Sequence, residues 1–254
     1  MAVCMLGLLG ATLPCASRAS TIAMQVTCGV VETNLVILLV NKGDESGHNV
    51  VTEVAFLDSL HHVPPSDRLD PGDPLVASFA IEDHNLTGIY PAVVTVRFED
   101  SNAYPFSSVT VHPVAFGAAR VPCIFGTLES ATLRKKRDLI LRVRNHSATD
   151  RSVRCRVVTA GELSANMQQE VVTLSANELR VLRIALEDLC VLPGSTYPVY
   201  VLMEYDEDGE HFCAIASTTV DVARSLPFHS WGFWVLLLLA GGGIGFAVFR
   251  SRTE

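Results

Sequence analysis

Cysteines are reactive residues whose number and spacing indicate what chemistry a chain could perform, and this sequence has seven among 254 residues. Cys4 and Cys15 lie near the N-terminus, and Cys28 stands apart from the others. No CxxC spacing occurs, which disfavours a zinc ribbon or a thioredoxin-type redox site. The four cysteines of the second half are candidates for two disulfides, with three pairings open, or else small buried apolar groups: Cys123, Cys155, Cys190 and Cys213.

Motifs of catalysis are missing from the sequence. It contains no nucleophile elbow, P-loop, HExxH pair or Rossmann glycine motif. The acidic run 206–210 lacks the ligand spacing of an EF-hand and suits a hairpin turn better. We therefore predict a protein that is not an enzyme, with no catalytic residue, metal or cofactor.

Charge is distributed unevenly along the chain, whose net charge is −8. Residues 21–118 carry three basic and twelve acidic residues, a formal charge of −9, whereas residues 121–224 carry twelve and fourteen, a charge of −2. This balance gives nucleic-acid binding little support. In the second half, arginines alternate with apolar residues, so our hypothesis is a basic patch for an acidic partner or anionic lipid headgroups. The patch comprises Arg142, Arg144 and Arg180, and the alternative is a solvated strand face.

Two Asn-x-Ser/Thr triplets could accept glycans in a secretory pathway. They begin at Asn85 and Asn145, one in each half of the chain. Both lie where loops are predicted, so both are candidate glycosylation sites.

The two ends of the chain predict its topology. Residues 1–20 contain an uncharged apolar run of signal-peptide length. Residues 231–249 carry no charge, begin at Trp231 and are followed by two arginines, which predicts a membrane helix over 229–249 with a cytoplasmic tail at 250–254. Within it, Gly241 and Gly245 form a GxxxG pair that favours helix association and a homo-oligomer. We thus expect a single-pass protein whose folded part is periplasmic, extracellular or lumenal.

Between the ends, short runs of alternating apolar residues are separated by Gly, Pro, Asn and Asp. This pattern is typical of β-strands in a sandwich. Two blocks recur in the same order: 35–41 resembles 139–145, and 90–100 resembles 197–207. Self-similarity of this kind indicates a tandem repeat. We predict an all-β fold, with two immunoglobulin-like β-sandwiches at 21–118 and 119–226 and one C-terminal transmembrane helix.

These repeated blocks resemble a known type of module. A Val-rich strand ending in Asn, a polar turn, and later a glycine shortly before Tyr-Pro and a long strand are similar to CARDB-like domains of bacterial and archaeal surface proteins. The translocon-associated β subunit of the endoplasmic reticulum has a similar plan, although with one sandwich. The first resemblance implies a membrane-anchored cell-envelope protein that binds another protein or mediates adhesion. The alternative is an accessory subunit of a membrane complex, of translocon-associated or transporter-associated type.

Overall fold

The computed structural model describes residues 22–81, 86–117 and 120–223. All regular elements in these ranges are β-strands, so the prediction of an all-β chain is confirmed. The predicted leader, the membrane segment with Gly241 and Gly245, and Asn85 lie outside the described residues. Within them, no helix has the length and apolarity needed to cross a membrane.

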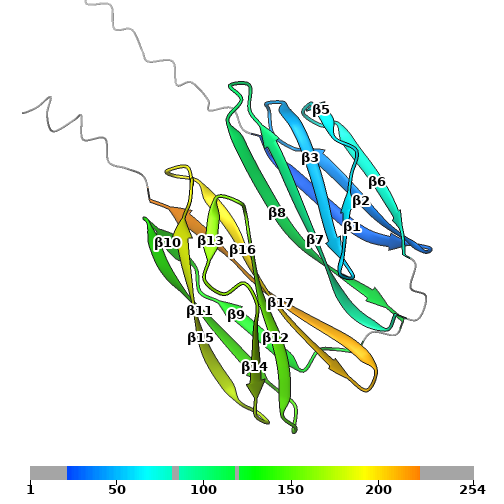
Figure 1. The fold of residues 1–254 in the computed structure, drawn as a ribbon, viewed down its shortest axis with the longest axis vertical. Helices are drawn as coiled ribbons and strands as arrows, with labels where there is room; N and C mark the ends of the chain where they lie inside the picture. The colour runs from blue at the N-terminus through cyan, green and yellow to red at the C-terminus, as the bar shows by residue number, and fades with distance from the viewer. Residues whose placement is uncertain (1–21, 82–85, 118–119, 224–254) are drawn as a thin grey trace, which may run out of the picture. The chain divides into compact units, whose positions relative to one another are not determined.

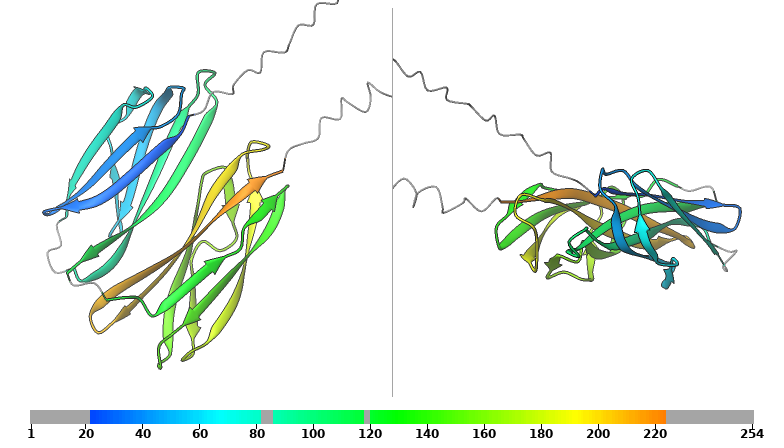
Figure 2. Two further views of the ribbon diagram at one scale, coloured as in Figure 1. Left: turned by 180° about the vertical axis from the view of Figure 1, so that it is seen from behind. Right: turned by 90° about the horizontal axis from the view of Figure 1, so that it is seen from above.

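The chain divides into two compact units, of which the first ends at Val114 and the second begins at Ala115. The short segment Thr87–Ile89 belongs to the second unit. The first unit consists of two antiparallel sheets (Figures 1 and 2). One sheet has the order β1-β2-β6; in the other, β8 pairs with β7, β7 with β3, and β3 with both β4 and β5. The strands are β1 (Met24–Val31), β2 (Asn34–Asn41), β3 (Gly47–Phe56), β4 (Ser59–His62), β5 (Ser66–Leu69), β6 (Pro74–Ala80), β7 (Gly88–Glu99) and β8 (Pro105–Phe116).

The second unit is again a two-layer sandwich. One sheet has the order β13-β15-β11-β9, and the other has the order β14-β12-β16-β17, with β10 parallel to β17. The strands are β9 (Ile124–Leu128), β10 (Ala131–Leu133), β11 (Lys136–Asn145), β12 (Arg151–Thr159), β13 (Leu163–Ala165), β14 (Glu170–Leu174), β15 (Leu179–Asp188), β16 (Thr196–Glu207) and β17 (Glu210–Val222).

Alternation of apolar residues builds the core of each unit. Side chains of a strand point to opposite faces in turn, so every second residue of β2 and β11 enters the space between the sheets. Leu35, Ile37 and Leu39 of β2 are at most 1% exposed, as are the equivalent residues Leu139, Leu141 and Val143 of β11. Burying side chains of this size contributes roughly 1.5–3 kcal/mol each.

The repeated sequence blocks occupy equivalent places in the two units. Leu35 of β2 pairs with Phe79 of β6, and Leu139 of β11 pairs with Ile184 of β15. The long strand of the second block pairs with β3 in one unit and β12 in the other. In the second unit the Tyr197 hydroxyl accepts a hydrogen bond from the Leu192 N–H at 3.1 Å, the tyrosine corner found in immunoglobulin-type sandwiches.

A buried asparagine ends an inner strand in each unit, β2 in the first and β11 in the second. Asn41 is fully buried, and its Nδ2 donates to the carbonyls of Glu45 and Leu69 at 2.7 and 3.1 Å. Its Oδ1 accepts from the Gly43 N–H at 3.0 Å. The side chain therefore fastens the following turn to a second loop, which explains why both blocks end in Asn.

Asn145 does the same in the second unit. Its Nδ2 donates to the carbonyls of Thr149 and Ser175 at 2.8 and 3.0 Å, and its Oδ1 accepts from the Ser147 N–H at 2.9 Å. The side chain is 0% exposed, and both hydrogens of its amide nitrogen are engaged in this folded arrangement. Glycosylation of Asn145 stays a prediction.

Replacing either asparagine by alanine should unfold its own unit preferentially. Asn41→Ala and Asn145→Ala each leave buried carbonyl and N–H groups without partners, which should lower the free energy of unfolding by about 3 kcal/mol. Urea unfolding of the full chain in mild detergent, followed by circular dichroism, measures this. Asn102→Ala in an exposed turn is the control and should cost less than about 1 kcal/mol. Equal effects of all three substitutions would contradict the assignment.

Candidate protein-binding site

The predicted basic patch is not assembled as expected. Arg142 and Arg144 do share the outer face of β11, but Arg180 lies opposite the buried Val143 and therefore on the inner side of the sheet edge. Arg180 forms an ion pair with Glu178 at 2.7 Å, and Arg142 pairs with Glu129. The three arginines therefore do not share one face, and two of them form ion pairs. Binding of an acidic partner or of anionic lipid headgroups by these residues stays a prediction.

The candidate disulfides are likewise absent among the described residues. Cys123, Cys155, Cys190 and Cys213 are all free thiols there. Burial raises the pKa of Cys155 to about 11 and that of Cys213 to about 12, so both stay protonated at neutral pH. Cys190 alone among these four is exposed.

Charged side chains of the described residues form no cluster suited to metal binding. One association of three ionisable groups places a histidine between two carboxylates on the β16–β17 hairpin. His211 Nδ1 lies 2.8 Å from Asp206 Oδ1, and its Nε2 lies 3.4 Å from Glu204 Oε1. The hydrogen bond to Glu204, followed by the one to Asp206, raises the pKa of His211 despite its partial burial.

The most unusual surface is an uncharged sheet in the acidic unit. The residues of β1, β2 and β6 include no Asp, Glu, Lys, Arg or His. Register places Thr27, Leu38 and Val76 in one row across the outer face of these strands. Val76 is 61% exposed, and Val31 at the end of β1 is 58% exposed. We call this outer face the ion-free face; it is the candidate site.

The fold itself does not require an ion-free face. At the positions of the second unit equivalent to Leu38 and Val40 stand Arg142 and Arg144, on the same outer side of the equivalent strand. Both arginines are exposed. The same sandwich therefore tolerates charge at these register positions, so their apolar character in the first unit needs another reason.

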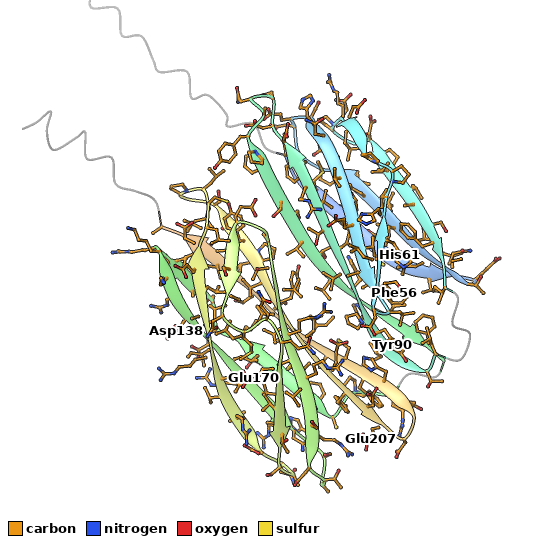
Figure 3. All side chains as sticks on the ribbon, in the orientation of Figure 1. Phe56, His61, Tyr90, Asp138, Glu170 and Glu207 are labelled. Atoms are coloured by element: carbon orange, nitrogen blue, oxygen red, sulfur yellow. The ribbon has the colours of Figure 1, made fainter. Side chains whose placement is uncertain are left out.

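A cleft adjoins this sheet at one edge. It encloses about 250 Å³ and is lined mainly by Leu35, Phe56, Leu57, Phe79 and Ile81. His61 of β4 and Phe79 of β6 approach across it with ring centroids 4.8 Å apart; Figure 3 shows His61 and Phe56 on the β3–β4 hairpin. Leu57 has φ +50°, a conformation that few residues other than Gly, Asn and Asp adopt.

Neither the ion-free face nor the cleft was predicted from the sequence. The face had a signal, since 24–31, 34–41 and 74–80 lack ionisable residues apart from a cysteine. The cleft had none, because it depends on which sheet the short strand β4 joins.

Comparison with known proteins does not assign the chain to a family. No family model matches the chain, and no curated protein matches it. Solved structures give weak similarities: native α-2-macroglobulin of E. coli, with TM-score 0.36 and 9% identity over 82% of this chain, and the periplasmic chaperone SfaE, with TM-score 0.33 and 12% identity over 81%. A Porphyromonas gingivalis W83 protein of unknown function gives TM-score 0.30 and 15% identity over 77%.

The chain spans 17% of the α-2-macroglobulin, 100% of SfaE and 99% of the P. gingivalis protein. These TM-scores all lie below 0.5, so the similarities carry no conclusion about fold or function. The CARDB-like resemblance is not confirmed by any of these comparisons.

Thiol accessibility offers a direct test of the free cysteines. At pH 7.5 we expect Cys190 to react with iodoacetamide well before Cys155 and Cys213, because it is exposed whereas they are buried and have raised pKa values. Peptide mapping by mass spectrometry reports the order. The two buried thiols should become reactive in urea, and protection of all three that ends only on reduction would instead show disulfides.

The raised pKa of His211 predicts a pH dependence of stability. The protonated form is favoured in the folded state, so this contribution is complete below pH 6.5 and is lost as pH rises through the folded pKa. The quantity to compare is the melting temperature at pH 5.5 minus the melting temperature at pH 8.5. This difference should be smaller in His211→Asn than in the unchanged chain, because the variant loses the contribution that His211 makes at low pH. His112→Asn is the control, because burial lowers the pKa of His112 and reverses the sign.

Proposed function

We propose that the chain is a non-enzymatic, membrane-anchored cell-envelope protein whose first sandwich binds another protein. The observation that carries this proposal is the ion-free face on a unit with a formal charge of −9. Exposed valines and leucine beside each other cost solubility, and contiguous apolar surface of this kind marks interaction sites. Two immunoglobulin-like modules on a C-terminal span at 229–249 would hold that face outside the cytoplasm.

The acidic unit also defines the chemistry of the partner. A protein that covers the ion-free face needs an apolar patch of its own to match Leu38 and Val76. Acidic groups lie in the turns around the sheet, at Glu32 and at Asp44 and Glu45, so a basic rim on the partner would be favoured by charge. We therefore expect a partner with an apolar patch surrounded by Lys and Arg.

Two valines provide a matched test. Val76→Glu places a charge on the ion-free face, and Val171→Glu places the same charge on the second unit; the two valines are 61% and 63% exposed. Proteins crosslinked to the full chain in native membranes are then quantified by mass spectrometry. We expect partners to drop about tenfold or more with Val76→Glu and stay unchanged with Val171→Glu.

Equal recovery from both variants would overturn the proposal. A second exchange addresses the alternative function, in which the chain is an accessory subunit held by its membrane helix. Replacing 229–249 by an unrelated span should leave the partner bound if the ion-free face carries the interaction. Loss of every partner in that exchange, with none lost in Val76→Glu, would favour the accessory subunit instead.

A further inference from the structure

The second unit closes the edge of its β9-β11-β15 layer with a short strand of its own. β13 pairs antiparallel with the end of β15, placing Ala165 opposite Leu186. Just beyond, the Asn166 N–H donates to the Ala185 carbonyl at 3.0 Å, and its Oδ1 accepts from the Ala185 N–H at 2.8 Å. Leu163 of β13 is 4% exposed, so it fills the space between the sheets.

The first unit has no such strand in the described residues. β6 corresponds to β15, because Leu35 pairs with Phe79 as Leu139 pairs with Ile184. Ala80 therefore occupies the position of Ala185, whose N–H and C=O point to the outer edge. In the part of the chain that the structure describes, β6 pairs only with β2, and the short strand β4 joins the opposite sheet through β3.

The cleft lies at this unfilled edge. Phe79, Ala80 and Ile81 line it from the end of β6, and Leu35, Phe56 and Leu57 close it from within. Ile81 corresponds to Leu186, the first of the three residues of β15 that β13 covers, and it is the one of their equivalents that lies among the described residues. Among the described residues, a backbone edge without a neighbouring strand and a cleft lined by Leu, Ile and Phe side chains thus meet next to the place where the second unit holds its own strand.

We propose that the end of β6 around Ala80 accepts an extended segment of a partner protein. The segment pairs antiparallel with β6 at Ala80, as Asn166 pairs with Ala185 of β15, and one of its apolar side chains fills the cleft. Backbone hydrogen bonds to a sheet edge supply affinity, while a pocket for alternate side chains supplies specificity. This inference rests on the proposed function and names the contact through which the first unit binds.

The charge at this end of the unit indicates which residues the bound segment should carry. Glu32 and Asp58 are exposed here, the first next to Thr33, whose carbonyl accepts from the Ile81 N–H at 2.8 Å. The basic residues of the unit are engaged or distant: Arg68 pairs with Asp70 at 2.6 Å, Arg97 pairs with Glu53, and Lys42 follows the opposite end of β2. A segment with Lys or Arg beside its apolar residue is therefore favoured.

The β13 segment itself supplies a probe. The peptide Lys-Leu-Ser-Ala-Asn-Met-Lys reproduces 163–167 with a lysine at each end, and its binding to the full chain in detergent is followed by fluorescence anisotropy. A second peptide with Ser in place of Leu and Met tests the need for an apolar side chain. We expect the first peptide to bind and the second to bind about tenfold more weakly or worse.

Leu57→Gly locates the binding site without harming the fold. Gly adopts φ +50° freely, so the substitution removes a cleft wall and should leave the melting temperature of the unit unchanged or higher. We expect it to weaken binding of the peptide about fivefold. The matched pair Asp58→Asn and Asp73→Asn removes one charge at the cleft and one at the opposite end of β6. Only the first should weaken binding, by about twofold to fivefold at low salt.

Three results would overturn the inference: equal binding of the two peptides, full binding by Leu57→Gly, or equal loss in Asp58→Asn and Asp73→Asn, which would show general attraction to an acidic unit. Each of these three results would leave the proposed function standing if Val76→Glu still releases the native partner. Peptide binding that meets all three expectations, combined with no effect of Val76→Glu, would keep the edge site and reject the ion-free face.

Discussion

Burial of one side of β2 is the constraint on which the rest of the first unit depends. Leu35, Ile37 and Leu39 point between the sheets and are almost completely inaccessible. Because successive side chains alternate, Val36, Leu38 and Val40 must point outward. A shift of one residue would only exchange one apolar set for another, so the buried Asn41 at the end of the strand has the further task of fixing the register.

Asn41 and Asn145 show how a polar residue can be indispensable within an apolar core. Each donates to the carbonyls of a turn and a neighbouring loop, and its own amide hydrogens are thereby satisfied inside the buried strand end. A buried carbonyl left without a donor costs about 1–3 kcal/mol, which exceeds what a single extra apolar contact would contribute. The repeated Val-rich strand therefore ends in Asn for a structural reason, and Ser147 of the triplet beginning at Asn145 joins the same network.

The sequence predicted those features that depend on local pattern. Alternation revealed the strands, and the recurrence of 35–41 at 139–145 revealed the equivalent core strands. The sequence pattern placed Arg180 on the wrong face of its strand. Arg180 and Arg183 are three residues apart, so a regular strand cannot turn both outward, and the pairing of Arg180 with Val143 shows that Arg180 is the one that faces inward. The cleft could not be predicted either, since nothing near 59–62 or 163–165 says that β4 joins β3 whereas β13 joins β15.

The two units therefore represent two solutions to one physical problem. A free strand edge presents unpaired backbone groups, and proteins usually cover it or place charges on it. The second unit does both, through β13 and through Arg183 on β15. In the first unit β6 has neither device in the described residues, and its outer row adds Val76 at 61% exposure. Within the part of the chain that the structure describes, one copy thus protects its edge, whereas the other presents an uncharged edge beside a cleft, which is the arrangement that binding of an added strand requires. This contrast within one molecule supports partner binding more strongly than either surface would alone.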